Sequence, residues 1–481
     1  MASSLIVSNK ESIPLRPSEA LGGIWQKFGI LPALAVTQVS VILLIGISGV
    51  LFTSPATNLI AVSLSALAGI YLLDRICIRD TFCPRMGRIL VFAFCARLAI
   101  GVVHYLWLIN PQYFIDSHHV NYLWDYEWLN DQMVYVRDYW MANGLFTALP
   151  PFFFLENKNA FLTMYDATLY YFGGVNVLSF AVWNSLHSIY TACIVGAIAL
   201  RCGTSKRLSA IAMAIAAFQP FGFISSIFWR DSSGQTWVAL ALYLLILAED
   251  STLLSLLALP ISCFLAFWQR QPYVLAVMAA SIAVNARHAR QSKTRMTLLI
   301  ALIAGMLALA VAVAQNDSLI ADTSQHAEDN LQQADRTVGS VSNIPVRVLK
   351  GLVGPFPWYN SFTQPNLEYA PVDYVQQVLN NVVYILILPV IPMLFRKRSA
   401  LTAYIPTVMY GAVLFTLGVV APGIHSGYVS FGTIFFLPLA VRRSEKAWKS
   451  YLVAVFIFFI AANAIYGALG LTGSNLGGSA Y

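Results

Sequence analysis

The sequence predicts an all-α protein, a bundle of about 11 to 13 membrane-spanning helices. Apolar residues make up 58% of the chain and charged residues only 11%. Several uncharged runs reach the roughly 20 residues that a helix needs to cross the hydrocarbon core of a bilayer. Lys and Arg gather in clusters between these runs, as in the cytoplasmic loops of membrane proteins. We therefore expect one integral-membrane domain over residues 1–481.

The apolar segments alternate across the membrane, with the N-terminus inside and the C-terminus outside. A polar tail, residues 1–29, carries Lys10, Arg16 and Lys27, and we expect it to stay in the cytoplasm without being cleaved as a signal peptide. The expected spans are residues 30–52, 57–74, 89–109, 176–200, 208–228, 235–249, 252–268, 273–286, 297–315, 378–395, 401–420, 428–441 and 450–471.

This orientation separates the charges by side. It places 21 of the 29 basic residues in the cytoplasm, 7 outside and Arg97 within a span. The net charge of +7 is thus explained by membrane insertion, and we expect no nucleic-acid partner. Because a charge inside a bilayer is costly, Arg97 is expected either to reach a lipid phosphate or to lock neighbouring helices together.

Two long segments lie outside on this topology, residues 110–175 and 316–377. In the first, helical spacing predicts a helix with two stripes, about 100° apart. One stripe contains Trp124, Trp128, Val136 and Trp140. The other contains Glu127, Asp131, Tyr135 and Asp138. Such a helix is expected to lie in the membrane interface, with its tryptophans among the lipid headgroups and its acids facing water or a cavity.

Cations on the external side are exceptions to the charge bias. A group of them suits a phosphate or pyrophosphate held at the level of the headgroups, because guanidinium and ammonium groups donate charge-assisted hydrogen bonds to phosphate oxygens. The alternative for Arg230 is a structural ion pair with its neighbour Asp231 or with another external acid. The external cations considered for phosphate binding are Arg137, Arg230, Arg270, Arg347 and Lys350.

The external acids are candidates for a general base. A sugar hydroxyl is a poor nucleophile, so a transferase that forms a glycosidic bond benefits from a carboxylate that takes the hydroxyl proton. Periodicity does not choose among the candidates, which are Asp116, Asp125, Glu127, Asp131, Asp138 and Asp166. A metal site at Asp125 and Glu127 is the weaker alternative, since one separated pair of acids is a poor signal; we expect no metal and no cofactor.

Several motifs together resemble the polyprenyl-dependent glycosyltransferases of the GT-C superfamily and membrane proteins of bacterial surface-polysaccharide clusters. They are Asp131-Gln132 with Tyr135, Tyr171-Phe172-Gly173, Asn184, Pro220 with Arg230-Asp231, and Pro355 to Trp358. The resemblance implies a multi-span bundle with interfacial helices in the first external loop, an acid there as base and a lipid-linked sugar donor bound outside.

Carried over to this chain, the resemblance makes Asp131 the base, with Glu127 and Asp125 in reserve. It makes Arg230 and Arg270 ligands of the donor phosphate, and Tyr135 and Trp358 part of the substrate site. Two departures stand out: Asp131-Gln132 replaces the usual Asp-Glu pair, and His425 lies where relatives often carry an arginine. His425 then either binds phosphate in its place or caps a helix.

Three functions remain open from the sequence. The first is an inverting transferase, in a bacterial inner membrane, that moves one sugar from a polyprenyl phosphate to a glycan or lipid acceptor. The second is a polymerase or ligase that joins repeat units from polyprenyl pyrophosphate. The third is a transporter or flippase without enzymatic activity, which predicts charged residues through the bilayer midplane; beyond Arg97 the sequence offers few.

Overall fold

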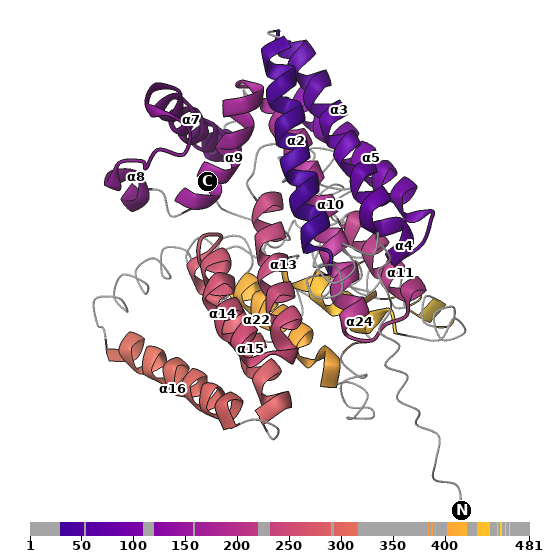
Figure 1. Cartoon of the computed structure of the whole chain (residues 1–481), viewed down its shortest axis with the longest axis vertical. Coiled ribbons are helices and arrows are strands. Elements are labelled where there is room, and N and C mark those ends of the chain that lie inside the picture. Colours follow the sequence, from indigo (N-terminus) through magenta and orange to yellow (C-terminus); the bar gives the residue numbers. More distant parts are fainter. Residues whose placement is uncertain are drawn as a thin grey trace, which may run out of the picture.

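The computed structural model is all-helical over the residues that it describes (Figure 1). These are residues 29–51, 54–108, 120–156, 159–219, 231–289, 293–315, 402–420 and 431–442, with a few isolated positions from 383 to 461. Side chains are not described at residues 50, 55–56, 103–127, 155–156, 306–315 and 418–420. The expected tail (1–29), the expected loop 316–377 and the expected spans 378–395 and 450–471 lie wholly or largely outside these residues.

Three helices in the described part are long and apolar enough to cross a membrane. They cover Leu31–Gly49, Thr57–Thr81 and Val177–Arg201. Shorter apolar helices cover Thr252–Phe267, Thr402–Leu417 and Phe431–Ala440. All six coincide with expected spans, because uninterrupted apolar sequence determines where a helix can run.

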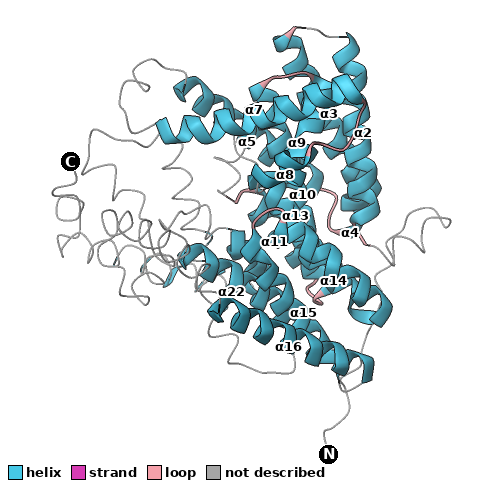
Figure 2. Cartoon of the chain, turned by 90° about the vertical axis from the view of Figure 1, so that its left-hand side faces the viewer, coloured by secondary structure: helices cyan, strands magenta, loops and turns pink. Residues whose placement is uncertain are grey.

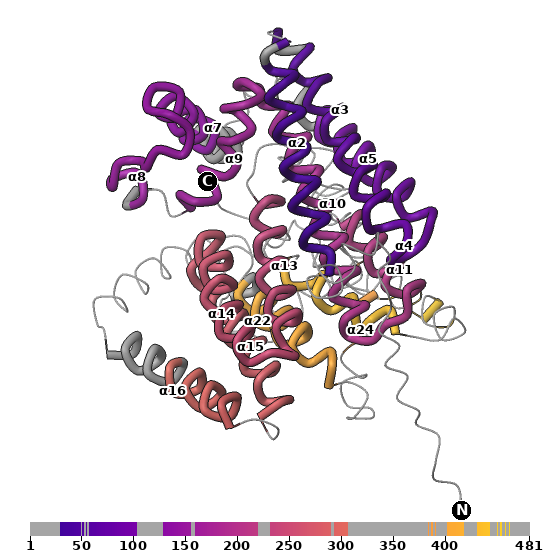
Figure 3. The backbone as a smooth tube through the Cα atoms, in the orientation of Figure 1, coloured from indigo at the N-terminus to yellow at the C-terminus, as the bar shows by residue number. Residues whose placement is uncertain are grey.

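The N-terminal helices form a compact group. α2 (Leu31–Leu51), α3 (Pro55–Leu73) and α5 (Met86–Leu108) run side by side, as the tube in Figure 3 shows. α3 starts at Ser54, whose hydroxyl accepts a hydrogen bond from the Thr57 backbone N–H, and at its other end it continues into a π-helical turn, η1 (Asp74–Ile78), and α4 (Arg79–Thr81).

α10 (Val177–Arg201) is the central helix. Nearly all of its side chains are buried, because α3, α5, α11 (Lys206–Ala217) and α13 (Asp231–Leu247) pack around it. Asn176 caps its first turn by accepting from two backbone N–H groups. A helix enclosed on every side can carry polar residues only where they find hydrogen-bond partners.

The second half of the chain packs as a further layer. α14 (Thr252–Phe267), α15 (Val274–His288) and α16 (Lys293–Gln315) lie side by side in Figure 2. α22 (Ile405–Val420) packs on α15. Short helical turns complete the layer: η2 (Ala248–Asp250), η3 (Gln271–Tyr273), η6 (Thr402–Tyr404) and η7 (Ile434–Phe436). The short helix that follows η7, α24 (Leu437–Ala440), packs against α10 and α11.

The backbone of α22 lies close to that of the helical residues 431–433, which lead directly into η7. A Cβ atom at Gly432 would lie 2.6 Å from the Phe415 backbone nitrogen. We expect Gly432→Ala to lower the free energy of unfolding by about 1–3 kcal/mol, because backbone atoms cannot move aside as a flexible side chain can. Thermal unfolding in detergent measures this. Gly305→Ala on α16, where nothing lies within 4 Å of the added methyl, is the control and should be neutral or stabilising.

Arg97 is buried within the bundle and locks two helices together. Its Nε donates to the carbonyl of Ala217 at 2.9 Å and its Nη2 to that of Gln219 at 2.7 Å. These carbonyls lie at the C-terminal end of α11, where backbone acceptors lack helical partners and a cation is favoured. Of the two roles expected for Arg97, these contacts support the locking of helices.

Candidate functional site

Three helices of the expected external segment 110–175 come together at one end of the bundle. They are α7 (Val120–Asn143), α8 (Pro151–Glu156) and α9 (Ala160–Gly173). Figure 1 shows α9 between α7 and the α2–α3–α5 group. The C-terminal end of α9 contacts α2 and the start of α3: the Asn58 side-chain amide donates to the Gly173 carbonyl, and the Gly173 Cα lies against Gly49. α9 therefore connects α7 to the bundle.

The Tyr171-Phe172-Gly173 motif forms this contact and ends α9. The helix stops at Gly174, whose backbone adopts φ +76° and donates to the Tyr170 carbonyl. Glycine reaches this conformation without steric cost, which is why it so often terminates helices. The motif thus serves the packing of α9.

A buried carboxylate fixes the middle of α9. Asp166 is fully buried; its Oδ1 accepts from Trp183 Nε1 of α10 at 3.0 Å and its Oδ2 accepts from Ser233 Oγ of α13 at 2.9 Å. A charged acceptor makes stronger hydrogen bonds than a neutral one, and more so away from water. One side chain therefore joins three helices at this end of the bundle.

A second pair of side chains reinforces the same junction. The Tyr165 hydroxyl lies 2.6 Å from His187 Nε2, and His187 Nδ1 lies 2.8 Å from the Trp183 carbonyl. Because a carbonyl can only accept, Nδ1 carries the proton and Nε2 accepts from Tyr165. Burial raises the pKa of Tyr165 well above its ordinary value, and the neighbouring Tyr190 and Asp166 raise it further. The phenol therefore stays protonated and donates its hydrogen bond.

Asp231 and Arg270, both predicted from the sequence, lie on adjoining turns. Asp231 opens α13 and is buried, and its Oδ1 accepts from Gln269 Nε2 at 3.3 Å. The lack of a side chain at Gly234 leaves room for the Gln269 amide. Arg270 follows directly, half-buried, between α14 and η3. Asp231 thus pairs with the turn between α14 and η3, and its expected partner Arg230 lies outside the described residues.

A continuous row of aromatic rings links α7 to the turn that carries Arg270. Tyr135 of α7 stacks on Phe153 of α8, with ring centroids 5.8 Å apart and planes 18° apart. Phe153 contacts Phe154 at 5.8 Å, and Phe154 contacts Phe161 of α9 at 5.4 Å. Phe161 then meets Trp268 at 4.5 Å, two residues before Arg270. We call these five rings the aromatic row.

Parts of the surface along the aromatic row are exposed. Phe152, beside Tyr135, is 49% exposed, and Phe264, beside Phe161, is 43% exposed. Aromatic faces at a membrane interface offer an apolar surface to lipid chains and to the hydrophobic faces of sugars. The rings of the row are themselves buried or half-buried, so the exposed apolar surface beside the row is formed by Phe152 and Phe264.

α7 presents its acidic stripe outward. Asp131 is exposed, and Tyr135 lies one helical turn away on the same side. Arg137 forms an ion pair of 2.9 Å with its neighbour Asp138, so its charge is already partly satisfied. Asp125 and Glu127 lie on α7, but their side chains are outside the description.

The C-terminal part of the tryptophan stripe differs from its expected place at the headgroups. Trp140 is buried, donates its Nε1–H to the Thr147 carbonyl at 3.1 Å, and contacts Phe146 and Tyr171. Val136 is also buried, whereas Trp128 is 40% exposed. The correction has a simple reason: a helix packed on α9 must bury one stripe in protein, and helical spacing does not tell a protein-facing stripe from a lipid-facing one.

The remaining predicted residues fall outside the described part of the chain. They are Asp116, Arg230, Arg347, Lys350, Trp358 and His425. Within the described part, no group of three or more His, Cys, Asp and Glu residues is arranged to hold a metal ion. Asn184 of the sequence motif lies fully buried on α10.

Sequence reasoning missed two features of the site. The sequence does not single out Phe161 and Trp268, because aromatic residues are common throughout this chain. Their contact joins two positions 107 residues apart, which no local pattern can reveal. Asp166 was one of six candidate acids, and nothing local marked it as the buried one. One signal for such a buried partner is the polar run Asp231 to Gln235 in the otherwise apolar α13. Buried polar side chains need hydrogen-bond partners, so this run predicts polar residues facing it from other helices.

Comparison with known proteins adds no assignment: no protein-family model, curated protein or solved structure matches this chain.

Proposed function

We propose that this protein is an integral-membrane glycosyltransferase that uses a polyprenyl-phosphate-linked sugar on the external face to build or modify a cell-surface polysaccharide. The observation that carries the proposal is the aromatic row, which connects Tyr135, one turn from Asp131, to Trp268, two residues before Arg270. Support also comes from the apolar helices and from the sorting of basic clusters to one side of the expected topology.

In the proposed reaction, the oxygen of an acceptor hydroxyl attacks the anomeric carbon of the donor sugar. The bond from that carbon to the phosphate oxygen breaks, so the configuration inverts and polyprenyl phosphate leaves with the electron pair. The Asp131 carboxylate takes the hydroxyl proton as the new glycosidic bond forms. Its exposure leaves it accessible to an acceptor.

Arg270 has the role of holding the donor phosphate. Its guanidinium can form paired hydrogen bonds with phosphate oxygens and stabilises the negative charge that the leaving group gains. Asp231 and Gln269 fix the backbone turn that carries it, through the hydrogen bond between their side chains. Arg230, which directly precedes Asp231 in the chain, is proposed to help bind the donor phosphate, together with Arg347, Lys350 and His425.

A repeat-unit polymerase or ligase is the second candidate. The number of external cations favours it, because a pyrophosphate carries more charge than a monophosphate and needs more ligands. The transporter is less favoured: Arg97, the one basic residue expected within a span, hydrogen-bonds two backbone carbonyls and so has a structural role.

The lipid-linked glycans that accumulate when the gene is deleted test the proposal. For a single-sugar transferase we expect a polyprenyl phosphate that carries one sugar, since its consumer is missing. For a polymerase we expect complete repeat units on polyprenyl pyrophosphate. Mass spectrometry of extracted lipids distinguishes the two by mass, and re-expression of the intact chain should clear the accumulated species.

An unchanged lipid-linked glycan pool after deletion, with unchanged surface polysaccharide, would contradict both enzymatic candidates. Accumulation on the cytoplasmic leaflet alone would indicate a flippase. The side is read by adding a membrane-impermeant glycosidase to sealed spheroplasts, because only outward-facing glycan is then cleaved.

A further inference from the structure

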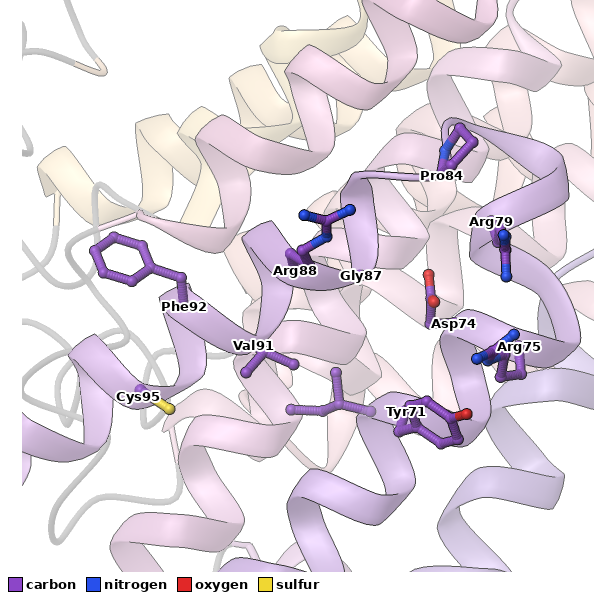
Figure 4. Close-up of a pocket in the computed structure, with 11 residues that line it drawn as sticks. Tyr71, Asp74, Arg75, Arg79, Pro84, Gly87, Arg88, Val91, Phe92 and Cys95 are labelled. Atoms are coloured by element: carbon purple, nitrogen blue, oxygen red, sulfur yellow. The ribbon is translucent and has the colours of Figure 1, made fainter.

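A pocket with basic residues at one end lies among α3, η1 and α5, within the N-terminal helix group. Its volume is about 550 Å³. Figure 4 shows Asp74 between Arg88 of α5 and the pair Arg75 and Arg79. The remaining lining residues are Ile70, Tyr71, Pro84, Gly87, Val91, Phe92 and Cys95. No part of the proposed transferase site contributes to this pocket.

The basic end of the pocket has an excess of positive charge. Three arginines and one aspartate line this end of the pocket, which leaves a net charge of +2 among the lining residues. All three arginines are exposed, so their charges remain available to a ligand. Arg75 also lies over the Tyr71 ring, with its guanidinium carbon 5.0 Å from the ring centroid, which limits the positions that its charge can take.

The backbone is shaped to hold Asp74 in the middle of these cations. A side chain at Gly87 would collide with the Asp74 carboxylate, and the Gly87 backbone N–H donates to it. The π-helical turn Asp74–Ile78 begins at the same residue. A π-turn shifts the register of the residues that follow, and such turns occur often at binding sites. Asp74 is therefore fixed by its contact with Gly87 and offsets part of the positive charge of Arg75 and Arg79.

One flank of the pocket is apolar and partly exposed. Ile70 and Val91 line it, and Tyr71 and Phe92 are 58% and 66% exposed. Exposed apolar side chains on helices of this hydropathy lie against lipid chains when the helices cross a membrane. The pocket thus has a cationic end and a lipid-facing apolar flank, which matches a molecule with a charged head and a hydrocarbon chain.

We propose that this pocket binds the phosphate headgroup of an anionic membrane lipid, with Arg75, Arg79 and Arg88 as its ligands. On the expected topology the four cations Arg75, Arg79, Arg85 and Arg88 face the cytoplasm. Basic pockets between helices on that side suit anionic headgroups. The apolar flank favours a lipid over a soluble phosphate, because it would add burial of hydrocarbon to the ionic contacts.

Binding of phosphatidylglycerol to the full-length protein tests the proposal. The protein is delipidated in a neutral detergent and titrated while native mass spectrometry counts bound lipids. Parallel titrations use phosphatidylcholine with the same chains and soluble glycerol 3-phosphate. We expect one site that prefers phosphatidylglycerol to both. For the double variant Arg79→Gln/Arg88→Gln we expect binding about 10- to 30-fold weaker, from the loss of two cations near the headgroup.

The matched control is the double variant Arg207→Gln/Lys293→Gln. It removes two exposed cations that lie outside the pocket and are also expected to face the cytoplasm. Unchanged affinity in this control, with thermal unfolding of both double variants close to that of the unaltered protein, supports a defined site. Equal weakening in both double variants would overturn it in favour of diffuse charge attraction. Equal binding of glycerol 3-phosphate would overturn the lipid assignment, and unchanged binding in Arg79→Gln/Arg88→Gln would remove the pocket from consideration.

Discussion

Asp131→Asn is expected to lower the rate of sugar transfer by about 100- to 10,000-fold, the usual contribution of a general base. Asparagine keeps the shape of the side chain but cannot take a proton from the acceptor hydroxyl. Because Asp131 is exposed on α7, its replacement should leave the amount of folded protein unchanged. The measurement is incorporation of labelled sugar into glycan by membranes that contain equal amounts of each variant.

The control for this variant lies on the same helix. Asp138→Asn removes the same charge from an exposed side chain whose ion pair with Arg137 lies on the surface. Such pairs contribute about 0–1 kcal/mol, so we expect nearly full activity. Full activity in Asp131→Asn would refute its role as base. Loss in Asp138→Asn but not in Asp131→Asn would assign the base to Asp138, about two helical turns farther along α7.

Asp166→Leu is expected to destabilise the protein by about 2–5 kcal/mol, the largest stability effect that we predict. The change leaves the Trp183 and Ser233 donors buried without their acceptor, and each such group costs about 1–3 kcal/mol. Because Asp166 joins α9 to α10 and α13, the loss should also loosen α7, which packs on α9. Thermal unfolding in detergent, together with proteolysis of residues 120–156, measures both effects.

Asp166→Asn separates hydrogen bonding from charge at the same position. Its carbonyl oxygen can still accept from Trp183, and its amide can donate to Ser233, whose hydroxyl can turn to accept. We therefore expect this variant to recover most of the stability lost in Asp166→Leu. If Asp166→Asn is as unstable as Asp166→Leu, the negative charge itself holds the junction. If Asp166→Leu is as stable as the unaltered protein, the junction does not depend on this residue.

The helices were largely predictable from the sequence, and their polar junctions were not. Apolar runs flanked by charge predicted α2, α3, α10 and α14 to within a few residues. A helix that crosses a bilayer needs about 20 uninterrupted apolar residues, so the ends of each run mark the ends of the helix. The expected span 208–228 begins two residues after the start of α11, which ends at Ala217, short of the expected boundary.

The candidate site was predictable only in part. The helical spacing of α7 separated its acids from its apolar residues, and the structure places Asp131 on the exposed side and Val136 on the buried side. The helical spacing gave no indication that Trp140 would face α9 instead of lipid. Both environments are apolar, so a residue pattern that measures only polarity cannot tell them apart.

The sequence by itself determined the helical class, the position of most described helices and the sorting of charge along the chain, since these follow from local polarity and from the length that crosses a bilayer. Only the tertiary structure decided that Asp166 joins α9 to α10 and α13, that a row of rings leads from Tyr135 to Trp268, and that Arg75, Arg79 and Arg88 surround one pocket. These features join residues on different helices, and the partner of a side chain across a helix boundary is set by packing in three dimensions.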